Sequence, residues 1–145
     1  ARVLCVENGK LRMLEGRDCR FSEKDSIFLA GIAVIGVWLR GRPSRPADIA
    51  RESCYFRKRR AVLPKGRSMG CTFVNPQGIS AGALIEACGL KGTRVGGAVI
   101  AEKHANFILN EGATSGDVAA LIALVKEEVR RQTGIALREE IRYLP

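Results

Sequence analysis

The sequence has no long uncharged apolar segment, which excludes one class of protein at the outset. A membrane-spanning helix needs about 18 or more consecutive apolar residues. The stretch that comes closest, residues 27–39, is shorter, lies inside the chain and lacks a cleavage site. It is predicted to be neither a membrane anchor nor a signal peptide, and we expect a soluble protein with no membrane partner.

Metal ligands are also scarce. The chain of 145 residues has a single histidine, and its five cysteines form no CxxC pair. Metal sites usually combine several His and Cys ligands at short spacing, so no metal site is predicted. An odd number of cysteines argues against a disulfide framework, and we predict reduced thiols in a cytoplasmic protein. The cysteines are Cys5, Cys19, Cys54, Cys71 and Cys88.

The glycine-rich region at residues 89–97 does not carry a dinucleotide-binding motif. Its glycines lack the GxGxxG spacing, and no predicted helix follows them at once. The pattern therefore predicts no site of that type here. The glycines concerned are Gly89, Gly92, Gly96 and Gly97.

What remains is the composition of a folded protein. Hydrophobic residues make up 46% of the chain, which is enough to fill a core. The length suits one domain, or a small domain with part of another. The order of predicted strands and helices indicates an α+β fold and not a doubly wound sheet.

The first 42 residues predict three strands and little else. Apolar runs on both sides of Asn8-Gly9 indicate a hairpin over residues 3–14. Residues 27–39, rich in Ile and Val, predict one further strand, with Gly31 and Gly36 as bends. Such a small sheet is marginal alone, so residues 1–42 are interpreted as the end of a larger sheet that this chain does not encode.

Residues 43–63 are predicted to form a linker built on one helix. Pro46 suits a first helical position, and the pattern indicates about three turns, with Ile49 and Phe56 among the apolar contacts. Residues 64–145 follow as a third region.

That third region contains two helices between short strands. Cys71 is predicted at the entrance of a strand over residues 72–74, and a helix over 80–88 is capped by Ser80 and closed by Gly89. Residues 107–109 predict another strand. The last helix begins behind Ser115 and Asp117 and ends at Gly134, and residues 135–144 predict a strand with Glu140 and Arg142 on one face. The helix's apolar stripe is Val118, Leu121, Ile122, Val125 and Val129.

The net charge of +9 indicates an anionic partner. A nucleic acid, a membrane surface or a phosphorylated small molecule would each satisfy it. Six cations occur within residues 57–67 without an acid among them, and they suit either a solvated helix end or an anion site. A basic nucleic-acid-binding module without catalysis is the alternative function, but only Tyr55 and Phe56 border the cluster as stacking residues, so no nucleic acid partner is expected. The cations are Arg57, Lys58, Arg59, Arg60, Lys65 and Arg67.

Two side chains attract attention for their chemistry, although each has a plainer interpretation. Cys71 lies between Gly70 and an Asn75-Pro76 stop, yet a lone cysteine is more often a small buried apolar residue. His104 is the single imidazole, and such a histidine is more often structural than a ligand or base. By pattern alone, the charges near Glu140 and in the loop over residues 21–26 are typical of solvated surface.

Several short blocks occur together in an order that is more specific than any one of them. They are Gly70-Cys71-Thr72-Phe73-Val74-Asn75-Pro76, Ser80-Ala81-Gly82, Leu84-Ile85-Glu86, Gly89-Leu90-Lys91-Gly92, Gly96-Gly97-Ala98, Glu102-Lys103-His104-Ala105-Asn106-Phe107 and Glu140-Ile141-Arg142. In this order the chain resembles the UDP-N-acetylenolpyruvoylglucosamine reductase (MurB) family of peptidoglycan synthesis. The resemblance implies an FAD enzyme that takes a hydride from NADPH and reduces the enolpyruvyl double bond to give UDP-N-acetylmuramate. It also implies a flavin domain before residue 1 and a compact α+β substrate-binding domain over residues 64–145. The isolated chain is therefore expected to be inactive.

The resemblance also implies roles for individual residues. Cys71 occupies the place where most members carry the serine that protonates the substrate carbon, and Glu140 that of the essential carboxylate. Lys24 stands where the family has the arginine of a Tyr-Arg-Asp-Ser loop, which here is Glu23-Lys24-Asp25-Ser26. An ammonium offers one point charge where a guanidinium offers two parallel bonds. The positions that match substrate contacts, to the diphosphate or the enolpyruvyl carboxylate, are Asn75, Lys91 and His104.

Overall fold

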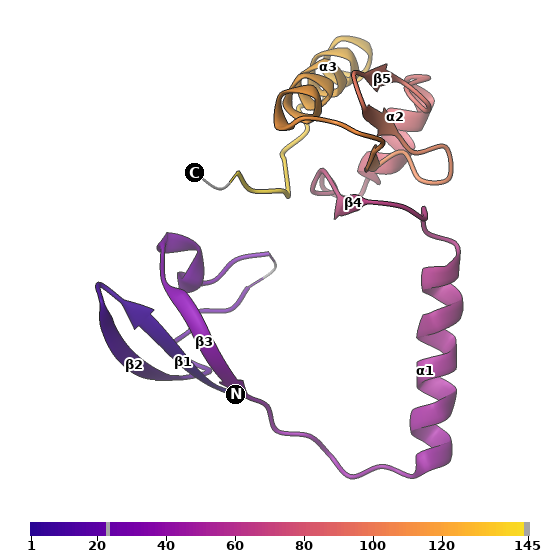
Figure 1. Ribbon diagram of the computed structural model, residues 1–145. Coiled ribbons are helices and arrows are strands. Elements are labelled where there is room, and N and C mark those ends of the chain that lie inside the picture. The colour runs from indigo at the N-terminus through magenta and orange to yellow at the C-terminus, as the bar shows by residue number, and fades with distance from the viewer. Residues whose placement is uncertain (23, 144–145) are drawn as a thin grey trace. The chain divides into compact units, whose positions relative to one another are not determined.

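The structure is a computed structural model that describes residues 1–22 and 24–143. It divides into two compact units, Ala1–Arg51 and Glu52–Pro145 (Figure 1). Both sheets are antiparallel, and the order of strands and helices shows no repeated βαβ units. The predicted α+β class is therefore confirmed. Within the described part of the chain, no helix combines the length and apolarity needed to cross a bilayer.

The first unit is a three-stranded antiparallel sheet. Strands β1 (Arg2–Glu7) and β2 (Lys10–Glu15) form the predicted hairpin, and β3 (Ala33–Trp38) pairs with the other edge of β1. Asn8 and Gly9 have φ values of 50° and 73°, and two left-handed residues are what a two-residue hairpin turn requires. A small apolar core lies against this sheet: Val3, Cys5, Leu14 and Cys19, with Ile27, Phe28 and Ile32 packed on it.

The apolar run over residues 27–39 is not the single strand that its composition predicts. Ile27–Ala30 form a 3₁₀ helix, Gly31 takes a left-handed φ of 82°, and β3 starts only at Ala33. The physical reason is the small core, because the helical turn lets Ile27 and Phe28 pack against it. An extended chain would have placed these two side chains beyond the core. Gly31 therefore acts as the predicted bend.

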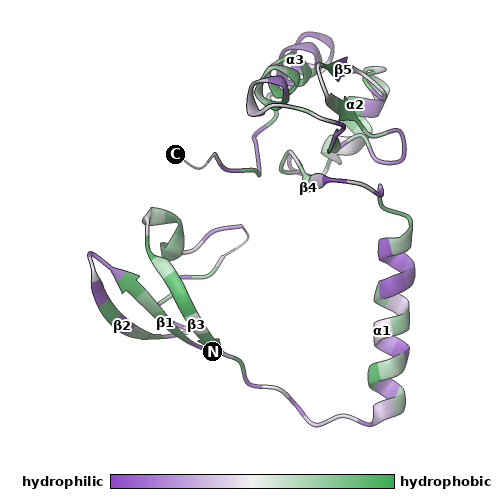
Figure 2. Cartoon of the chain, viewed as in Figure 1, coloured by the Kyte–Doolittle hydropathy of each residue, from purple (hydrophilic) through white to green (hydrophobic). Residues whose placement is uncertain are grey.

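Helix α1 (Pro46–Ala61) begins at the predicted proline but is longer than predicted. Its 16 residues make more than four turns at about 3.6 residues per turn. None of them is buried, and Ile49 and Phe56 are 53% and 56% exposed. Figure 2 shows hydrophilic residues on successive turns. Phe56 meets the ring of its neighbour Tyr55 at 5.4 Å between centroids, but neither of the two predicted contact residues is buried in the described chain.

The second unit is a four-stranded antiparallel sheet with two helices. The sheet order is β4-β7-β6-β5, with β4 (Ser68–Cys71), β5 (Arg94–Val95), β6 (Ala98–Ile100) and β7 (Phe107–Asn110). Helices α2 (Ala81–Ala87) and α3 (Ser115–Thr133) supply much of the core. Burial of this apolar set is the main term that stabilises the unit. The buried residues are Phe73, Ala81, Ile85, Leu90, Ala98, Ile100, Ala105, Ile108, Leu121, Ile122, Val125, Val129 and Leu137.

The helix ends follow local rules with one correction. Ser80 caps α2 by accepting a hydrogen bond from the Ala83 amide at 3.3 Å, as predicted. For α3 the capping residue is Thr114, one position before the predicted Ser115. Thr114 and Asp117 form a reciprocal capping box, which satisfies two backbone N–H donors. With Ser115 as the cap, the third helical residue would be Val118, whose side chain cannot accept a hydrogen bond. These bonds lower the pKa of Asp117.

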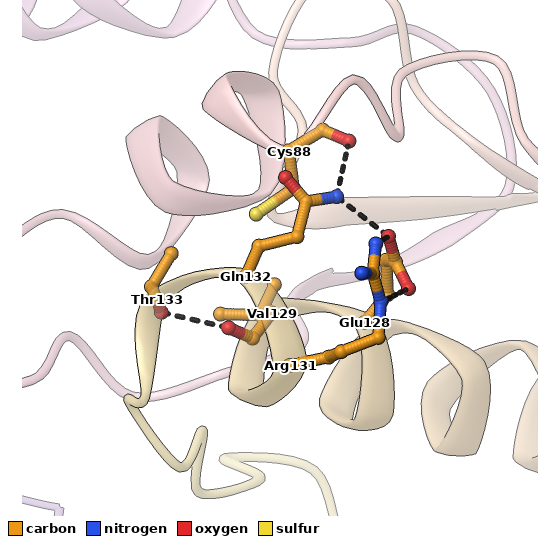
Figure 3. A network of polar contacts seen from close by, with 6 residues as sticks. All are labelled: Cys88, Glu128, Val129, Arg131, Gln132 and Thr133. Carbon is orange, nitrogen blue, oxygen red and sulfur yellow. Dashed lines mark hydrogen bonds and ion pairs between the residues drawn. The ribbon is translucent and has the colours of Figure 1, made fainter.

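The end of α3 is tied to the end of α2. Gln132 donates from Nε2 to the Cys88 carbonyl at 3.3 Å and to Glu128 at 2.6 Å (Figure 3). Arg131 also pairs with Glu128, and the two donors lower the pKa of that carboxyl to about 2. Gly134, with φ of 74°, ends the helix as predicted.

Two predicted strands have other forms. The strand near the thiol is Ser68–Cys71, so Cys71 ends it and does not open it. Residues 72–74 and 138–140 form only an isolated bridge between Phe73 and Glu139, and the described part of 135–144 contains no regular strand. Alternation of side chains does not reveal that each segment finds a partner for only a few residues.

Candidate functional site

Cys71 lies at the last position of β4, where this strand leaves the sheet. It pairs with Phe107 of β7 across an irregular register, and its side chain is half-buried. Gly70 has a left-handed φ of 85°, a conformation that glycine adopts without steric cost. The local geometry therefore places the thiol at a bend in the backbone.

The C-terminal segment meets the chain directly after this thiol. The Glu140 amide donates to the Thr72 carbonyl at 2.8 Å, and the Val74 amide donates to the Arg138 carbonyl at 2.9 Å. Glu140 lies 69 positions beyond Cys71 in the sequence, yet it is hydrogen-bonded to Thr72, the residue directly after Cys71. The structure brings the two predicted catalytic residues onto facing backbone segments.

Glu139 fastens this segment to α3. Its carboxylate accepts from Lys126 Nζ at 2.7 Å and from the Tyr143 hydroxyl at 3.0 Å. The ammonium contact, more than any other, lowers the pKa of Glu139. Burial and the carboxylate raise the pKa of Tyr143. The charged edge that the pattern assigns to solvent therefore contains one anchoring residue next to Glu140.

Asn75 and the start of α2 form the next part of the site. Asn75 Oδ1 accepts from the Ala81 amide at 3.0 Å, so its side chain holds the first turn of α2. Asn75 is an exposed residue, and its predicted substrate contact stays a prediction.

His104 is held from three sides. Its Nδ1 accepts from the Asn106 amide at 3.3 Å, and its ring meets Phe107 edge to face at 5.0 Å between centroids. A Cβ atom on Gly82 would approach His104 Cε1 to 3.1 Å, so the absence of that atom leaves room for the ring. Because Nδ1 accepts, the neutral tautomer with a proton on Nε2 fits this arrangement.

Lys91 and Lys24 complete the predicted set at other places. Lys91 pairs with Glu86 at 2.5 Å, beyond the far end of α2. Lys24 belongs to the first unit, where its φ of 60° is left-handed beside an isolated bridge between Ser22 and Asp25. Glu23 lies outside the described residues. In the second unit, Glu140 is hydrogen-bonded through its backbone to the residue after Cys71. Asn75 and His104 each lie beside the first turn of α2.

One buried polar residue was not singled out from the sequence. Asn106 is 2% exposed, and its side chain bonds both backbone groups of Phe73 at 2.8 Å. An amide inside an otherwise apolar run, Ala105 to Leu109, is the signal that could have revealed it, because a buried polar group needs partners.

The basic cluster lies on the last turns of α1 and just after it. Its side chains are exposed, and Arg59 sits over the Tyr55 ring at 5.7 Å. The nucleic-acid alternative stays untested. Among the described residues, no three His, Cys, Asp or Glu side chains are grouped to hold a metal ion.

The architecture has a counterpart among solved structures. The crystal structure of UDP-N-acetylenolpyruvylglucosamine reductase (MurB) from Thermus caldophilus matches with a TM-score of 0.88 at 34% identity. The match covers 99% of this chain and 52% of that one. The fold thus defines the class, an α+β chain built like part of a MurB reductase.

Sequence comparisons carry the assignment to the family. Residues 63–144 match the model of the UDP-N-acetylenolpyruvoylglucosamine reductase C-terminal domain. Reductases of that name from Protochlamydia amoebophila and Moorella thermoacetica are 41% and 44% identical over 96% and 92% of this chain. The chain belongs to this MurB family. It spans about half the length of these curated relatives, 47% and 45% respectively.

Proposed function

We propose that the chain provides the substrate-binding and proton-donating part of a UDP-N-acetylenolpyruvoylglucosamine reductase, an oxidoreductase of peptidoglycan synthesis in the cytoplasm. The observation that carries this proposal is the bond between the Glu140 amide and the Thr72 carbonyl at 2.8 Å. This bond supports the proposal because Glu140 and Cys71 belong to the two backbone segments that it joins. The division into residues 1–42, 43–63 and 64–145 belongs to the same proposal.

Cys71 is the proposed proton donor. Reduction of the enolpyruvyl double bond adds a hydride to one carbon and a proton to its neighbour. A thiol with an ordinary pKa of about 8.5 is mostly protonated at neutral pH, so it can supply that proton as a general acid. The half-buried position at the end of β4 suits a group that meets substrate.

Charge develops on the substrate carboxylate before the proton arrives. Preorganised cations or hydrogen-bond donors stabilise such a developing enolate. We assign this role to Lys24 as a cation and to Glu140 as a protonated carboxyl group that donates a hydrogen bond, at the positions that the resemblance implies. An ammonium in place of the family's guanidinium offers one point of contact, and turnover is expected to be lower or differently arranged.

Asn75, Lys91 and His104 are the proposed substrate contacts. Support comes from the second unit: Asn75 and His104 lie next to the first turn of α2, and Lys91 follows its end. An amide, an ammonium and an imidazole suit the oxygen atoms of a diphosphate or carboxylate. A UDP-sugar is therefore the proposed ligand.

FAD and NADPH are the proposed cofactors, and no residue of this chain is assigned to either. Bound FAD, reduced by NADPH, would supply the hydride. The described part of the first unit is a three-stranded sheet with a core of four buried residues, too little to enclose a flavin. The proposed flavin site lies mainly in the half of the relatives that this chain does not span.

Substitution of Cys71 in the complete flavin-containing enzyme tests the proposal. Cys71→Ser should retain substantial turnover, because a hydroxyl can also deliver a proton. Cys71→Ala should stop product formation while NADPH still reduces the flavin. Stopped-flow absorbance of the flavin and product assay separate the two half-reactions.

The opposite outcome would identify a nucleophile. If Cys71→Ser were as inactive as Cys71→Ala, or if iodoacetamide alkylated the half-buried Cys71 at pH 7 much faster than the exposed Cys54, the donor role would be wrong. A nucleophile has to be a thiolate, whereas an acid has to keep its proton.

A further inference from the structure

We propose that Asn106 is a positioning residue, which fixes the backbone that carries the Cys71 thiol. The proposal deepens the function proposed above and rests on it for its catalytic consequence. Asn106 lies immediately before β7 and is 2% exposed. A buried amide has to be paired, and its partners decide what it holds in place.

Three hydrogen bonds join Asn106 to the two residues after Cys71. Its Oδ1 accepts from the Phe73 amide at 2.8 Å, and its Nδ2 donates to the Phe73 carbonyl at 2.8 Å. Its own backbone carbonyl accepts from the Thr72 amide at 2.8 Å. A side-chain amide provides one acceptor and one donor, so it binds Phe73 as a neighbouring strand would.

The Asn106 side chain takes the place of a neighbouring strand because the pairing of β4 with β7 ends at Cys71. Pairing between β4 and β7 is irregular between Ser68 and Cys71, and its last rung joins Cys71 to Phe107. Beyond this rung, residues 72–74 turn to the C-terminal segment. Phe73 is 1% exposed, so without Asn106 its amide and carbonyl would be buried and unpaired.

The hydrogen bonds of Asn106 to Thr72 and Phe73 also fix Glu140 relative to the thiol. The Thr72–Phe73 backbone is held by Asn106 on one side, while the Thr72 carbonyl accepts from the Glu140 amide on the other. Movement of this backbone therefore changes the placement of both proposed catalytic groups. A misplacement of about 1 Å can lower a rate by about 100-fold.

Asn110 offers a matched control at the other end of β7. Its Oδ1 accepts two backbone hydrogen bonds, from Gly112 at 3.0 Å and Ala113 at 2.8 Å. Asn110→Ala also removes two hydrogen bonds between an asparagine side chain and the backbone, but Asn110 is exposed and its oxygen accepts both bonds. The variant leaves the Cys71 segment unaltered, so it reports what the loss of two such bonds beside β7 does by itself.

The first test uses the chain itself and needs no turnover. In Asn106→Ala, hydrogen exchange should become at least 10-fold faster at the Phe73 amide, relative to core amides of α3 such as that of Leu121. Alkylation of Cys71, followed by peptide mass spectrometry, should change in rate by several-fold. Asn110→Ala should alter neither quantity.

Asn106→Asp adds a pH-dependent rescue. The introduced carboxyl, when protonated, can accept from the Phe73 amide and donate to the Phe73 carbonyl, as the natural amide does. Its ionised form would be buried against a carbonyl oxygen, so its pKa should rise above the unfolded value of about 3.9. The Phe73 amide should therefore be normally protected from hydrogen exchange at a pH below that unfolded pKa. This protection should be lost as pH rises through the raised pKa of the folded state.

The second test measures turnover in the complete enzyme. Asn106→Ala should lower kcat for substrate reduction by about 100-fold, while flavin reduction by NADPH and the KM for NADPH stay at their normal values. Asn106→Asp should regain kcat towards low pH. Equal loss in Asn110→Ala would show a general stability effect and overturn the proposal.

The two proposals fail in different ways. Unchanged Phe73 exchange and Cys71 alkylation in both Asn106 variants would overturn the positioning role, whatever the enzyme does. Normal turnover in Cys71→Ala would overturn the proposed function instead. If Asn106→Ala does not fold, Asn106→Asp still tests the positioning role. Protection of the Phe73 amide from hydrogen exchange that does not depend on pH in this variant would contradict that role.

Discussion

Gly82 lets α2 pack closely against the ring of His104. A Cβ at this position would come within 3.1 Å of His104 Cε1 and 3.3 Å of its Nδ1, tighter than ordinary van der Waals contact. Gly116 occupies the same second position in α3, and a Cβ there would meet nothing closer than 3.6 Å. The two glycines therefore form a natural pair for comparison.

Gly82→Ala is expected to destabilise the second unit, although alanine is the better helix former. Helix propensity favours alanine by up to about 1 kcal/mol, whereas overpacking a core costs about 1–3 kcal/mol. The net loss in the free energy of unfolding should be about 1 kcal/mol, measured by urea denaturation. Gly116→Ala should leave stability equal or raise it. A stabilised Gly82→Ala would show that His104 is free to move.

The C-terminal segment depends on α3 for its position. Lys126 on that helix pairs with Glu139 at 2.7 Å, and the next residue bonds to Thr72. The two side chains are 44% and 22% exposed, so solvent screens the pair and its contribution is at most about 1 kcal/mol. Its importance is local, because it holds the segment that carries Glu140.

Glu139→Gln should loosen this segment without unfolding the domain. The Glu140 amide should exchange faster, while amides of the α3 core stay protected. Glu128→Gln, which breaks the Arg131 pair on the same helix, is the control and should leave Glu140 unchanged. Equal effects from both variants would mean that the pair at Glu139 has no special role.

The same tether predicts a pH dependence. The folded-state pKa of Glu139 is lowered, chiefly by Lys126, so its contribution is present above the unfolded value of about 4.3. It is lost as pH falls through the lower folded value. Between pH 5 and the acid limit, Glu140 exchange should therefore accelerate in the natural sequence but change less in Glu139→Gln.

The chain as a whole is expected to bind no flavin by itself. Its first unit has only three strands and a small core, and the chain spans about half the length of its curated relatives. The purified chain should lack absorbance near 450 nm and should not acquire it after incubation with FAD and gel filtration. A yellow preparation with one FAD per chain would contradict this prediction and move the flavin site into residues 1–145.

Local interactions explain which parts of the fold the sequence predicted well. The hairpin follows from Asn8-Gly9, and α2 follows from Ser80 and Gly89, because each signal acts within a few residues. The apolar spacing of α3 likewise placed Leu121 and Val125 in the core. The resemblance to the MurB family, and not any pattern alone, implies catalytic roles for Cys71 and Glu140.

Tertiary structure decided the features that depend on partners distant in sequence. Whether residues 72–74 and 138–140 form a strand depends on their mutual pairing, and that pairing lasts for one bridge only. Asn106 acts on Phe73 across 33 positions, a contact that no local pattern encodes. The sequence by itself determined turns, caps and helices, since their energies are local, while the placement of the thiol and the carboxylate required the folded backbone that joins them.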